Sequence, residues 1–147
     1  MSKLIVPAAV LVWVTVLIAA GLTPLNVKTG LWQVTMTSKI STLPAPNTST
    51  YKSCVKKEDL DKYPFTDPSA DCNWKVQNST GSEMEATGVC KPQGLGNVNF
   101  NIKLVASDPE NVKGTGQLSI NGPAGVMNGT YSGTAKWIGT ICPAGVQ

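Results

Sequence analysis

Histidine and arginine are both missing from this sequence of 147 residues, and each absence excludes a class of function. Without histidine, the usual serine and cysteine triads of nucleophilic catalysis cannot form, and the commonest metal ligand is absent. Without arginine, the chain lacks the side chain best suited to bidentate recognition of guanine or phosphate. We therefore expect no catalytic triad, no metal, no cofactor and no nucleic-acid partner.

Charge of either sign is also scarce, at 14% of residues against roughly 25% in a typical globular chain. The 12 lysines and 9 acidic residues are interspersed without a basic block, so no phosphate-tracking surface is indicated. Glu83 and Glu85 would share one face of a strand, but that face points to solvent if Met84 and Ala86 point inward. Paired carboxylates need burial to act as acid and base. We expect that the protein is not an enzyme.

The one long hydrophobic run is at the N-terminus. Lys3 precedes an uncharged, mostly apolar stretch, residues 4–22, that ends in the small residues Ala19, Ala20 and Gly21. This arrangement is typical of a secretory signal. The run is also close to the ~20 residues that a membrane-spanning helix needs, so an uncleaved anchor is the alternative and would be the chain's only contact with a membrane. Both interpretations export the body of the chain, to the periplasm or the extracellular space.

The body contains four cysteines, Cys54, Cys72, Cys90 and Cys142. An even number of cysteines in an exported chain favours two disulfides. Zinc is the weaker alternative, because it requires closely spaced cysteine pairs or histidines. Three pairings satisfy the sequence. We expect Cys54–Cys72 with Cys90–Cys142, because the first pair would close one compact excursion between two strands.

Alternation of apolar and polar residues dominates the body and predicts half-buried strands. Short turns rich in Gly, Pro, Asn and Asp separate the alternating stretches, a pattern typical of antiparallel sheets. The fold class we predict is all-β, an antiparallel up-and-down meander of about seven strands closing toward a barrel, with one short helix at residues 56–63. The predicted strands are residues 30–39, 48–55, 72–77, 83–90, 98–104, 112–120 and 127–137. The predicted organisation is a signal peptide or anchor (1–21), a tether (22–29), the β domain (30–142) and a tail (143–147).

The face of these strands that we assign to the interior has two notable sets of residues. One set is small: Gly88, Gly114, Gly116, Gly129, Gly133 and Ala135. Strand glycines permit sheet coiling or close backbone approach, and they would also leave room for a ligand. The other set is large and apolar, and tryptophans in it are most often core residues. If the interior is hollow, the large residues become the walls of an apolar pocket. The predicted ligand-binding residues are Trp32, Met36, Phe100, Tyr131 and Trp137.

Three stretches of the body together resemble a known family. Residues 30–35 read GLWQVT, residues 54–59 read CVKKED, and residues 132–142 read SGTAKWIGTIC. In this order and with four cysteines, they resemble the bacterial exported family catalogued as domain of unknown function 3617, over residues 30–142. Members often have a Met- and Pro-rich insert after the first strand, which here is reduced to residues 43–46. The resemblance implies a location in a Gram-negative cell envelope and no particular activity.

Two classes of function follow from these features. The first is an exported, disulfide-stabilised β protein of the cell envelope that binds an apolar or amphiphilic small molecule inside the barrel. The alternative is a structural or protein-interaction module of the envelope that has no small-molecule ligand and contacts another envelope protein. A cavity open at one end would favour the first, and a packed core with an exposed apolar patch would favour the second.

Overall fold

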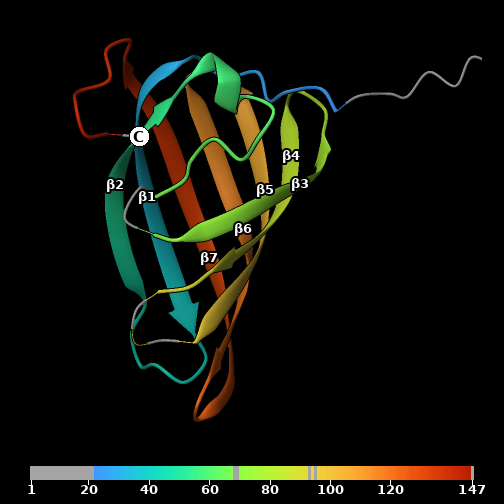
Figure 1. The fold of residues 1–147 in the computed structure, drawn as a ribbon, viewed down its shortest axis with the longest axis vertical. Coiled ribbons are helices and arrows are strands. Elements are labelled where there is room, and N and C mark those ends of the chain that lie inside the picture. Colours follow the sequence, from blue (N-terminus) through green and yellow to red (C-terminus); the bar gives the residue numbers. More distant parts are fainter. Residues whose placement is uncertain (1–21, 68–69, 93, 95, 147) are drawn as a thin grey trace, which may run out of the picture.

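A single antiparallel sheet of seven strands makes up the fold, in the order β2-β1-β7-β6-β5-β4-β3 (Figure 1). The structure is a computed structural model that describes residues 22–67, 70–92, 94 and 96–146; the predicted leader, residues 1–21, lies outside the described residues. The seven strands predicted from the alternation are confirmed. They are β1 (Gly30–Ile40), β2 (Asn47–Val55), β3 (Cys72–Ser79), β4 (Glu83–Cys90), β5 (Asn97–Asp108), β6 (Asn111–Gly122) and β7 (Gly125–Gly139).

The alternation of the sequence maps directly onto the two faces of the sheet. In β4, for example, Met84 and Ala86 are buried while Glu83 and Glu85 are exposed. The pairing register keeps the apolar residues of neighbouring strands on the same face, since Met84 lies opposite Leu104 of β5. A slip by one residue would turn this whole set to solvent, so burial of one face fixes the register.

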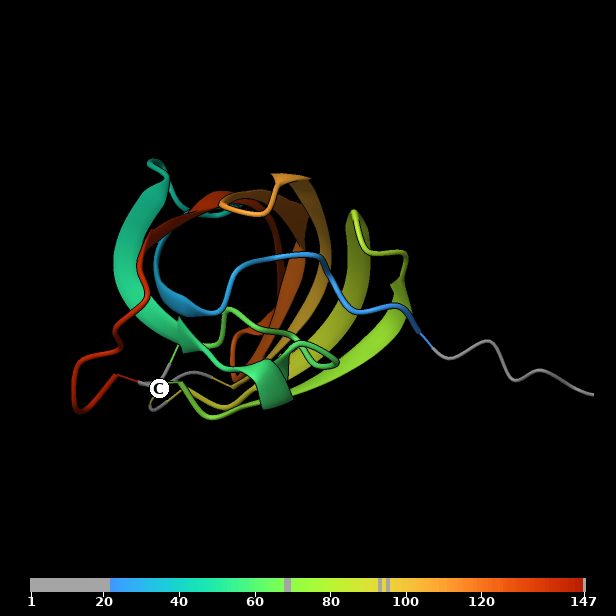
Figure 2. The ribbon, with the colours of Figure 1, turned by 90° about the horizontal axis from the view of Figure 1, so that it is seen from above.

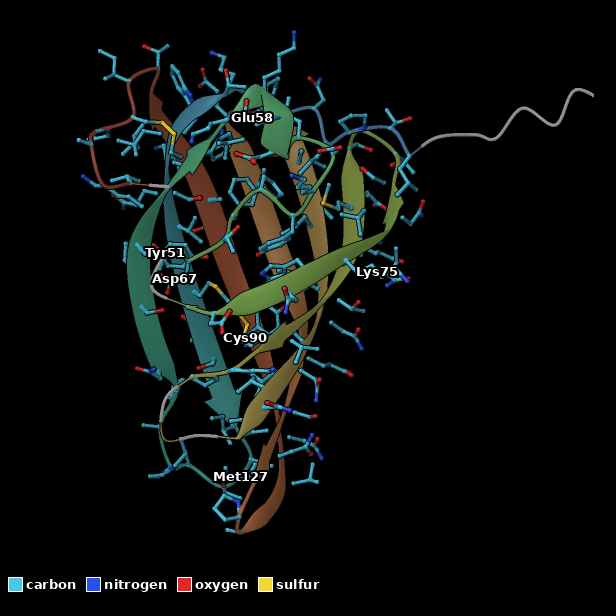
Figure 3. The ribbon with its side chains drawn as sticks, viewed as in Figure 1. Tyr51, Glu58, Asp67, Lys75, Cys90 and Met127 are labelled. Carbon is cyan, nitrogen blue, oxygen red and sulfur yellow. A yellow bond between two sulfur atoms is a disulfide. The ribbon has the colours of Figure 1, made fainter. Side chains whose placement is uncertain are left out.

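The sheet curls strongly but does not close, which corrects the prediction of a barrel (Figure 2). Its two edge strands, β2 and β3, do not pair with each other in the described part of the chain. The segment between them runs through the gap instead and buries Tyr63 and Phe65 there. Two β2 side chains hold this segment, because Tyr51 (labelled in Figure 3) donates to the Phe65 carbonyl at 2.7 Å and Ser53 donates to the Pro64 carbonyl at 3.3 Å. These bonds take the place of strand pairing.

The short helix predicted for residues 56–63 is also wrong. Only a three-residue 3₁₀ turn, Lys57–Asp59, forms there. The Asp59 carboxylate accepts the Lys56 N–H at 3.3 Å, which caps the turn. A longer helix would have to overcome the cost of nucleation within a few residues of Pro64, and the chain must extend to carry Tyr63 into the gap. Within the described ranges, no helix has the length and apolarity needed to cross a bilayer.

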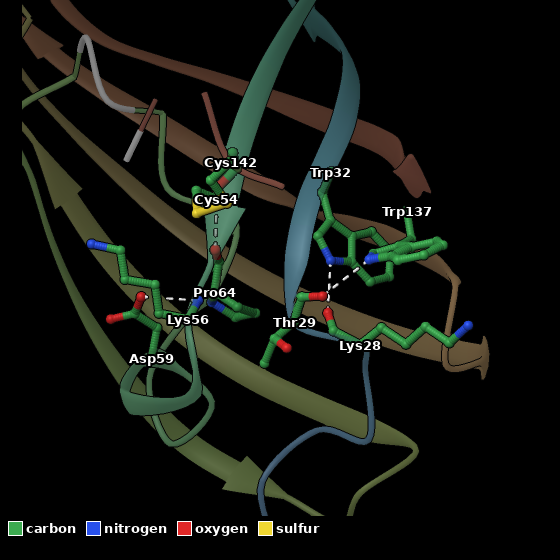
Figure 4. The surroundings of a disulfide bond; sticks show 10 residues. Lys28, Thr29, Trp32, Cys54, Lys56, Asp59, Pro64, Trp137 and Cys142 are labelled. Atoms are coloured by element: carbon green, nitrogen blue, oxygen red, sulfur yellow. Dashed lines mark hydrogen bonds between the residues drawn. A yellow bond between two sulfur atoms is a disulfide. The ribbon is translucent and has the colours of Figure 1, made fainter. Parts of the chain in front are cut away.

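Residues 22–29, expected as a tether, pack against one end of the sheet. Leu25 is 1% exposed and belongs to the core. The segment is held by two indoles, since Trp32 donates to the Lys28 carbonyl at 2.9 Å and Trp137 donates to the Thr29 carbonyl at 3.1 Å (Figure 4). We call this end of the sheet, drawn uppermost in Figure 1, the upper end.

Both disulfides form, but our predicted pairing is wrong. The bridges are Cys54–Cys142 and Cys72–Cys90. Cys72 lies directly opposite Cys90 in the β3–β4 register, whereas Cys54 is on β2, at the other edge of the sheet. The chain that leaves β7 passes β1 and reaches β2, where Cys142 meets Cys54 (Figure 4). The prediction failed because the excursion between Cys54 and Cys72 connects the two opposite edges of the sheet, so these cysteines lie on strands that do not pair.

The upper half of the curl is filled with side chains. A row of aromatic rings runs through the interior, and the centroids of successive rings are 4.0–6.5 Å apart. The row consists of Trp32, Phe65, Tyr63, Trp74, Phe100 and Tyr131, with the Phe65–Tyr63 step the longest at 6.5 Å. The void left beside this row has a volume of about 20 Å³, enough for about one water molecule. The upper half is therefore a packed core.

Candidate ligand cleft

An apolar cleft of about 200 Å³ opens at the other end of the curled sheet. We call this the lower end: β1 runs into β2 there and β6 runs into β7, lowermost in Figure 1. The cleft lies between β1 and β2 on one side and β5, β6 and β7 on the other. It is lined by Met36, Ser38, Ile40, Ser49, Val98, Phe100, Leu118, Ile120 and Tyr131.

The strand registers bring these residues together. Met36 of β1 lies opposite Ser49 of β2, and Phe100 of β5 lies opposite Leu118 of β6. Where a strand contributes more than one lining residue, these residues are two apart in sequence, and alternate residues of a strand project to the same face of the sheet. The curl of the sheet then turns β1 and β2 to face β5 and β6 across the cleft.

The aromatic row marks where the packed upper core ends. Phe100 and Tyr131 line the cleft and contact each other edge to face, with centroids 5.5 Å apart. The Tyr131 hydroxyl donates to the Asn101 carbonyl at 3.2 Å, which fixes the ring. Burial raises the pKa of Tyr131 well above its ordinary value, so its phenol stays neutral at physiological pH. Tyr131 therefore contributes an apolar face and no charge.

No charged side chain lines this cleft among the residues that the structure describes. Its polar groups are the hydroxyls of Ser38 and Ser49, both at least partly exposed. Small-molecule pockets commonly measure roughly 300–1,000 Å³. At about 200 Å³ the cleft is smaller than this range, so it suits an acyl segment or a single ring. Because the cleft is open on one side, the rest of an amphiphilic molecule can extend into solvent past the two hydroxyls.

Of the five predicted ligand-binding residues, the structure places Met36, Phe100 and Tyr131 together in this cleft. Trp32 and Trp137 lie at the upper end instead. Trp32 is fully buried, with its ring centroid 5.2 Å from that of Phe65. The Trp137 ring is covered by the Lys28 ammonium, 4.5 Å from its centroid. Both indoles hold the N-terminal segment to the sheet.

The small inward residues do not create the cleft, because large side chains from neighbouring strands cover them. Trp74 lies across Gly88, its direct partner, where an added Cβ would approach the Trp74 ring to 2.5 Å. Tyr131 lies across Gly116 in the same way. Glycine here permits close approach of a ring to the backbone. These glycines therefore do not leave room for a ligand, the other interpretation considered for them.

Sequence reasoning missed most of the apolar wall. Ile40, Val98, Leu118 and Ile120 all line the cleft, and none was predicted as a site residue. The sequence pattern could have indicated them, because Ile40 is an even number of residues from Met36 and Val98 is an even number from Phe100, which places each pair on the same inward face. What the alternation alone could not indicate is which part of the inward face stays uncovered, because this depends on where residues 60–67 pack.

A wider depression of about 710 Å³ lies on the opposite face of the sheet. Amides and hydroxyls of β4 to β7 make up most of its side chains, including Asn99, Asn101 and Gln117. This is the polar outer face of the strands, where water satisfies these groups, so we regard the smaller apolar cleft as the better candidate site. No group of three or more metal-ligating side chains comes together in the part of the chain that the structure describes.

Comparison with protein families gives a match over most of the chain. The model of the family described as protein of unknown function (DUF3617) matches residues 27–142, which include all seven strands and both disulfides. No curated protein and no solved structure matches the chain.

Proposed function

The chain belongs to the DUF3617 family of proteins of unknown function, so its role must be inferred from its own cleft, and we propose that it is a binding protein for an apolar or amphiphilic small molecule. The observation that carries this proposal is the apolar cleft at the lower end, which is open, uncharged and lined by side chains of five strands. The proposed role is binding and not catalysis.

The energetics of the cleft favour an apolar occupant. Each buried methylene contributes about 0.8 kcal/mol on transfer from water. A charged group would be unfavourable inside, because the lining offers only hydroxyls and a neutral phenol. An amphiphile would place its chain against Phe100 and Leu118 and keep its polar group at the mouth, near Ser38 and Ser49.

We further propose that the protein acts outside the cytoplasm, in the cell envelope. Two disulfides form and the described residues include no free cysteine, which is compatible with an oxidising compartment. The leader-like sequence of residues 1–21 supports the same location.

A protein-interaction module remains the second candidate. The observation in its favour is the open sheet, whose edge strands β2 and β3 leave backbone groups available for pairing with another chain. Such a module would need no occupant in the cleft.

The test is binding of N-phenyl-1-naphthylamine, an uncharged apolar fluorophore, to the purified protein. Ser49→Phe places a ring in the cleft, whereas Thr48→Phe, one residue away, places the same ring on the outer face and serves as the matched control. We expect Ser49→Phe to weaken dye binding by about tenfold, equivalent to about 1.4 kcal/mol, and Thr48→Phe to leave it unchanged. Equal affinity in all three proteins, or no binding by any, would contradict the proposal. Native mass spectrometry of protein from an envelope fraction would then identify the ligand class.

A further inference from the structure

Most of the lower end of the sheet is formed by segments without any charged residue. Residues 40–51, 92–102 and 114–135 contain no Asp, Glu or Lys. They include the β1–β2 turn, the β6–β7 hairpin and the lower part of β5, whereas the charged residues Asp71 and Lys91 flank the lower ends of β3 and β4. In a protein with 21 charged residues, 12 basic and 9 acidic, the charge is confined to the rest of the molecule.

Two of these turns form one structural unit, which we call the tip and define as residues 41–46 and 122–127. The Ser41 N–H donates to the Asn128 carbonyl at 3.0 Å, and the Thr42 hydroxyl lies 3.4 Å from the Met127 sulfur. Figure 3 shows Met127 near the lower extremity of the molecule. The two turns therefore present a single surface.

The tip exposes large aliphatic side chains. Leu43 is 52% exposed on one turn and Val126 is 64% exposed on the other. Three prolines, Pro44, Pro46 and Pro123, lack a backbone N–H, which lowers the cost of removing the turns from water. Isolated exposed apolar residues are common on protein surfaces. The tip differs because its exposed aliphatic residues lie on joined turns with no charge among them.

The first charges behind the tip are positive in six of the seven strands. Moving up from the lower end, the first charged residue is Lys39 in β1, Lys52 in β2, Lys75 in β3, Lys103 in β5, Lys113 in β6 and Lys136 in β7, whereas in β4 it is Glu85. Of these, Lys39 is the closest to the tip in sequence, and Lys91 follows the lower end of β4. An apolar extremity with Lys39 directly behind it complements an anionic bilayer surface, with apolar side chains entering the interface and the cation remaining among the headgroups.

We propose that the tip docks on the surface of a lipid bilayer and there places the mouth of the cleft against the lipid. Ile40 and Ile120, which line the cleft, adjoin the two tip segments, so the cleft opens beside the docked surface. The lipid phase then supplies or receives the apolar ligand. This inference rests on the proposed binding function and adds a membrane contact beyond the one expected from an uncleaved leader.

A local probe of insertion tests the proposal independently of any anchor. Leu43→Trp and Ile141→Trp variants are mixed with phosphatidylcholine–phosphatidylglycerol vesicles whose acyl chains are brominated, which quench a tryptophan that enters the bilayer. Ile141 is the matched control, because it is an aliphatic residue 80% exposed and follows the upper end of β7. We expect quenching of the Leu43→Trp signal above the background of the native tryptophans, and none at Ile141→Trp. Equal quenching of both, or of neither, would overturn the proposal.

Vesicle co-sedimentation tests the same contact by removal. We expect the double variant Leu43→Asp/Val126→Asp to bind these vesicles about tenfold more weakly, because two carboxylates replace the entering side chains, and Ile141→Asp to bind like the unmodified protein. An unchanged affinity of the double variant would refute docking through the tip and would direct the search to a protein partner.

Failure of this inference can be told apart from failure of the proposed function. Dye binding by the Leu43→Asp/Val126→Asp variant is measured in solution without vesicles, where the cleft alone decides the result. Retained dye binding with unquenched Leu43→Trp would leave the cleft as a binding site and remove only the membrane contact.

Discussion

Tyr131 lies across Gly116, its direct partner on the neighbouring strand, and its hydroxyl reaches past that glycine to the Asn101 carbonyl on the next strand, at 3.2 Å. The ring thus spans β7, β6 and β5 with no side chain beneath it. This contact sets the boundary between the packed upper core and the cleft, because the same ring lines both the small void above and the cleft below.

Replacing Gly116 by alanine should disrupt this boundary. The added Cβ would overlap the Asn101 carbonyl oxygen and approach the Tyr131 ring to 2.9 Å. We expect Gly116→Ala to lower the free energy of unfolding by about 1–3 kcal/mol, measured by urea denaturation. Gly139→Ala is the control, since a Cβ there meets no atom within 4 Å, and it should leave stability unchanged or slightly raised. Equal destabilisation by both substitutions would show that the close approach is not what requires glycine.

Phe65 is the residue whose removal should most weaken the segment that fills the gap. It is 2% exposed and contacts Trp32 and Tyr63. We expect Phe65→Ala to lower the free energy of unfolding by about 3–5 kcal/mol, because the neighbouring aromatic rings cannot move far enough to fill the cavity that it leaves. Leu43→Ala removes an exposed side chain of comparable chemistry and should change stability by no more than about 0.5 kcal/mol. Thermal unfolding of both variants checks this, and a Phe65→Ala loss as small as that of Leu43→Ala would contradict the filled gap.

The two disulfides should differ in their effect on stability. Cys54–Cys142 closes a loop with a sequence separation of 88 residues, and Cys72–Cys90 one of 18. Restriction of the unfolded chain predicts losses of about 4.5 and about 3 kcal/mol, respectively, when each pair is replaced by alanine. Urea unfolding of the two double variants measures the difference. A larger loss on removing Cys72–Cys90 would mean that native contacts of β3 outweigh the entropy of loop closure.

Buried tyrosines should make the protein sensitive to alkali. Burial is the main cause that raises the pKa of Tyr51, Tyr63 and Tyr131 above the ordinary value. For such groups the stabilisation is fully present below the unfolded-state pKa of about 10, and it is lost as pH rises from there through the folded-state pKa. We expect unfolding free energy to fall above about pH 10. Tyr63→Phe should reduce the steepness of that fall, and an identical pH profile for the two proteins would contradict the assignment.

The strands were predictable because their signal is local. In β4 the identity of alternate residues, Met84 and Ala86 against Glu83 and Glu85, is enough to indicate a half-buried strand. Closure of the sheet was not predictable from such signals. It depends on Tyr63 and Phe65, which follow the short 3₁₀ turn and show no periodicity of their own, yet they fill the space that a seventh pairing, between β2 and β3, would need.

The candidate site was only partly predictable for the same reason. Met36, Phe100 and Tyr131 were identified as inward and large, and the structure brings them together. Trp32 has the same local signature as Met36, four residues away on the same face of β1, but Phe65 covers it. Which inward residues remain accessible is decided by a contact between distant parts of the chain, and the alternation of one strand contains no information about it. The same limitation explains the disulfide pairing, because Cys54 and Cys142 meet across β1.

The position of β1 between β2 and β7 determines the order in which this protein can fold. The β1–β2 hairpin and the consecutive hairpins of β3 to β7 can form as they emerge, but the pairing of β1 with β7 must wait for the last strand of the chain. During that wait Cys54 is unpaired, and the first thiol it meets is Cys72, at the same 18-residue spacing that separates Cys72 from its native partner. We expect oxidation during synthesis to form Cys54–Cys72 in part of the molecules. Thiol–disulfide exchange would then have to release it before the last strand can join the sheet.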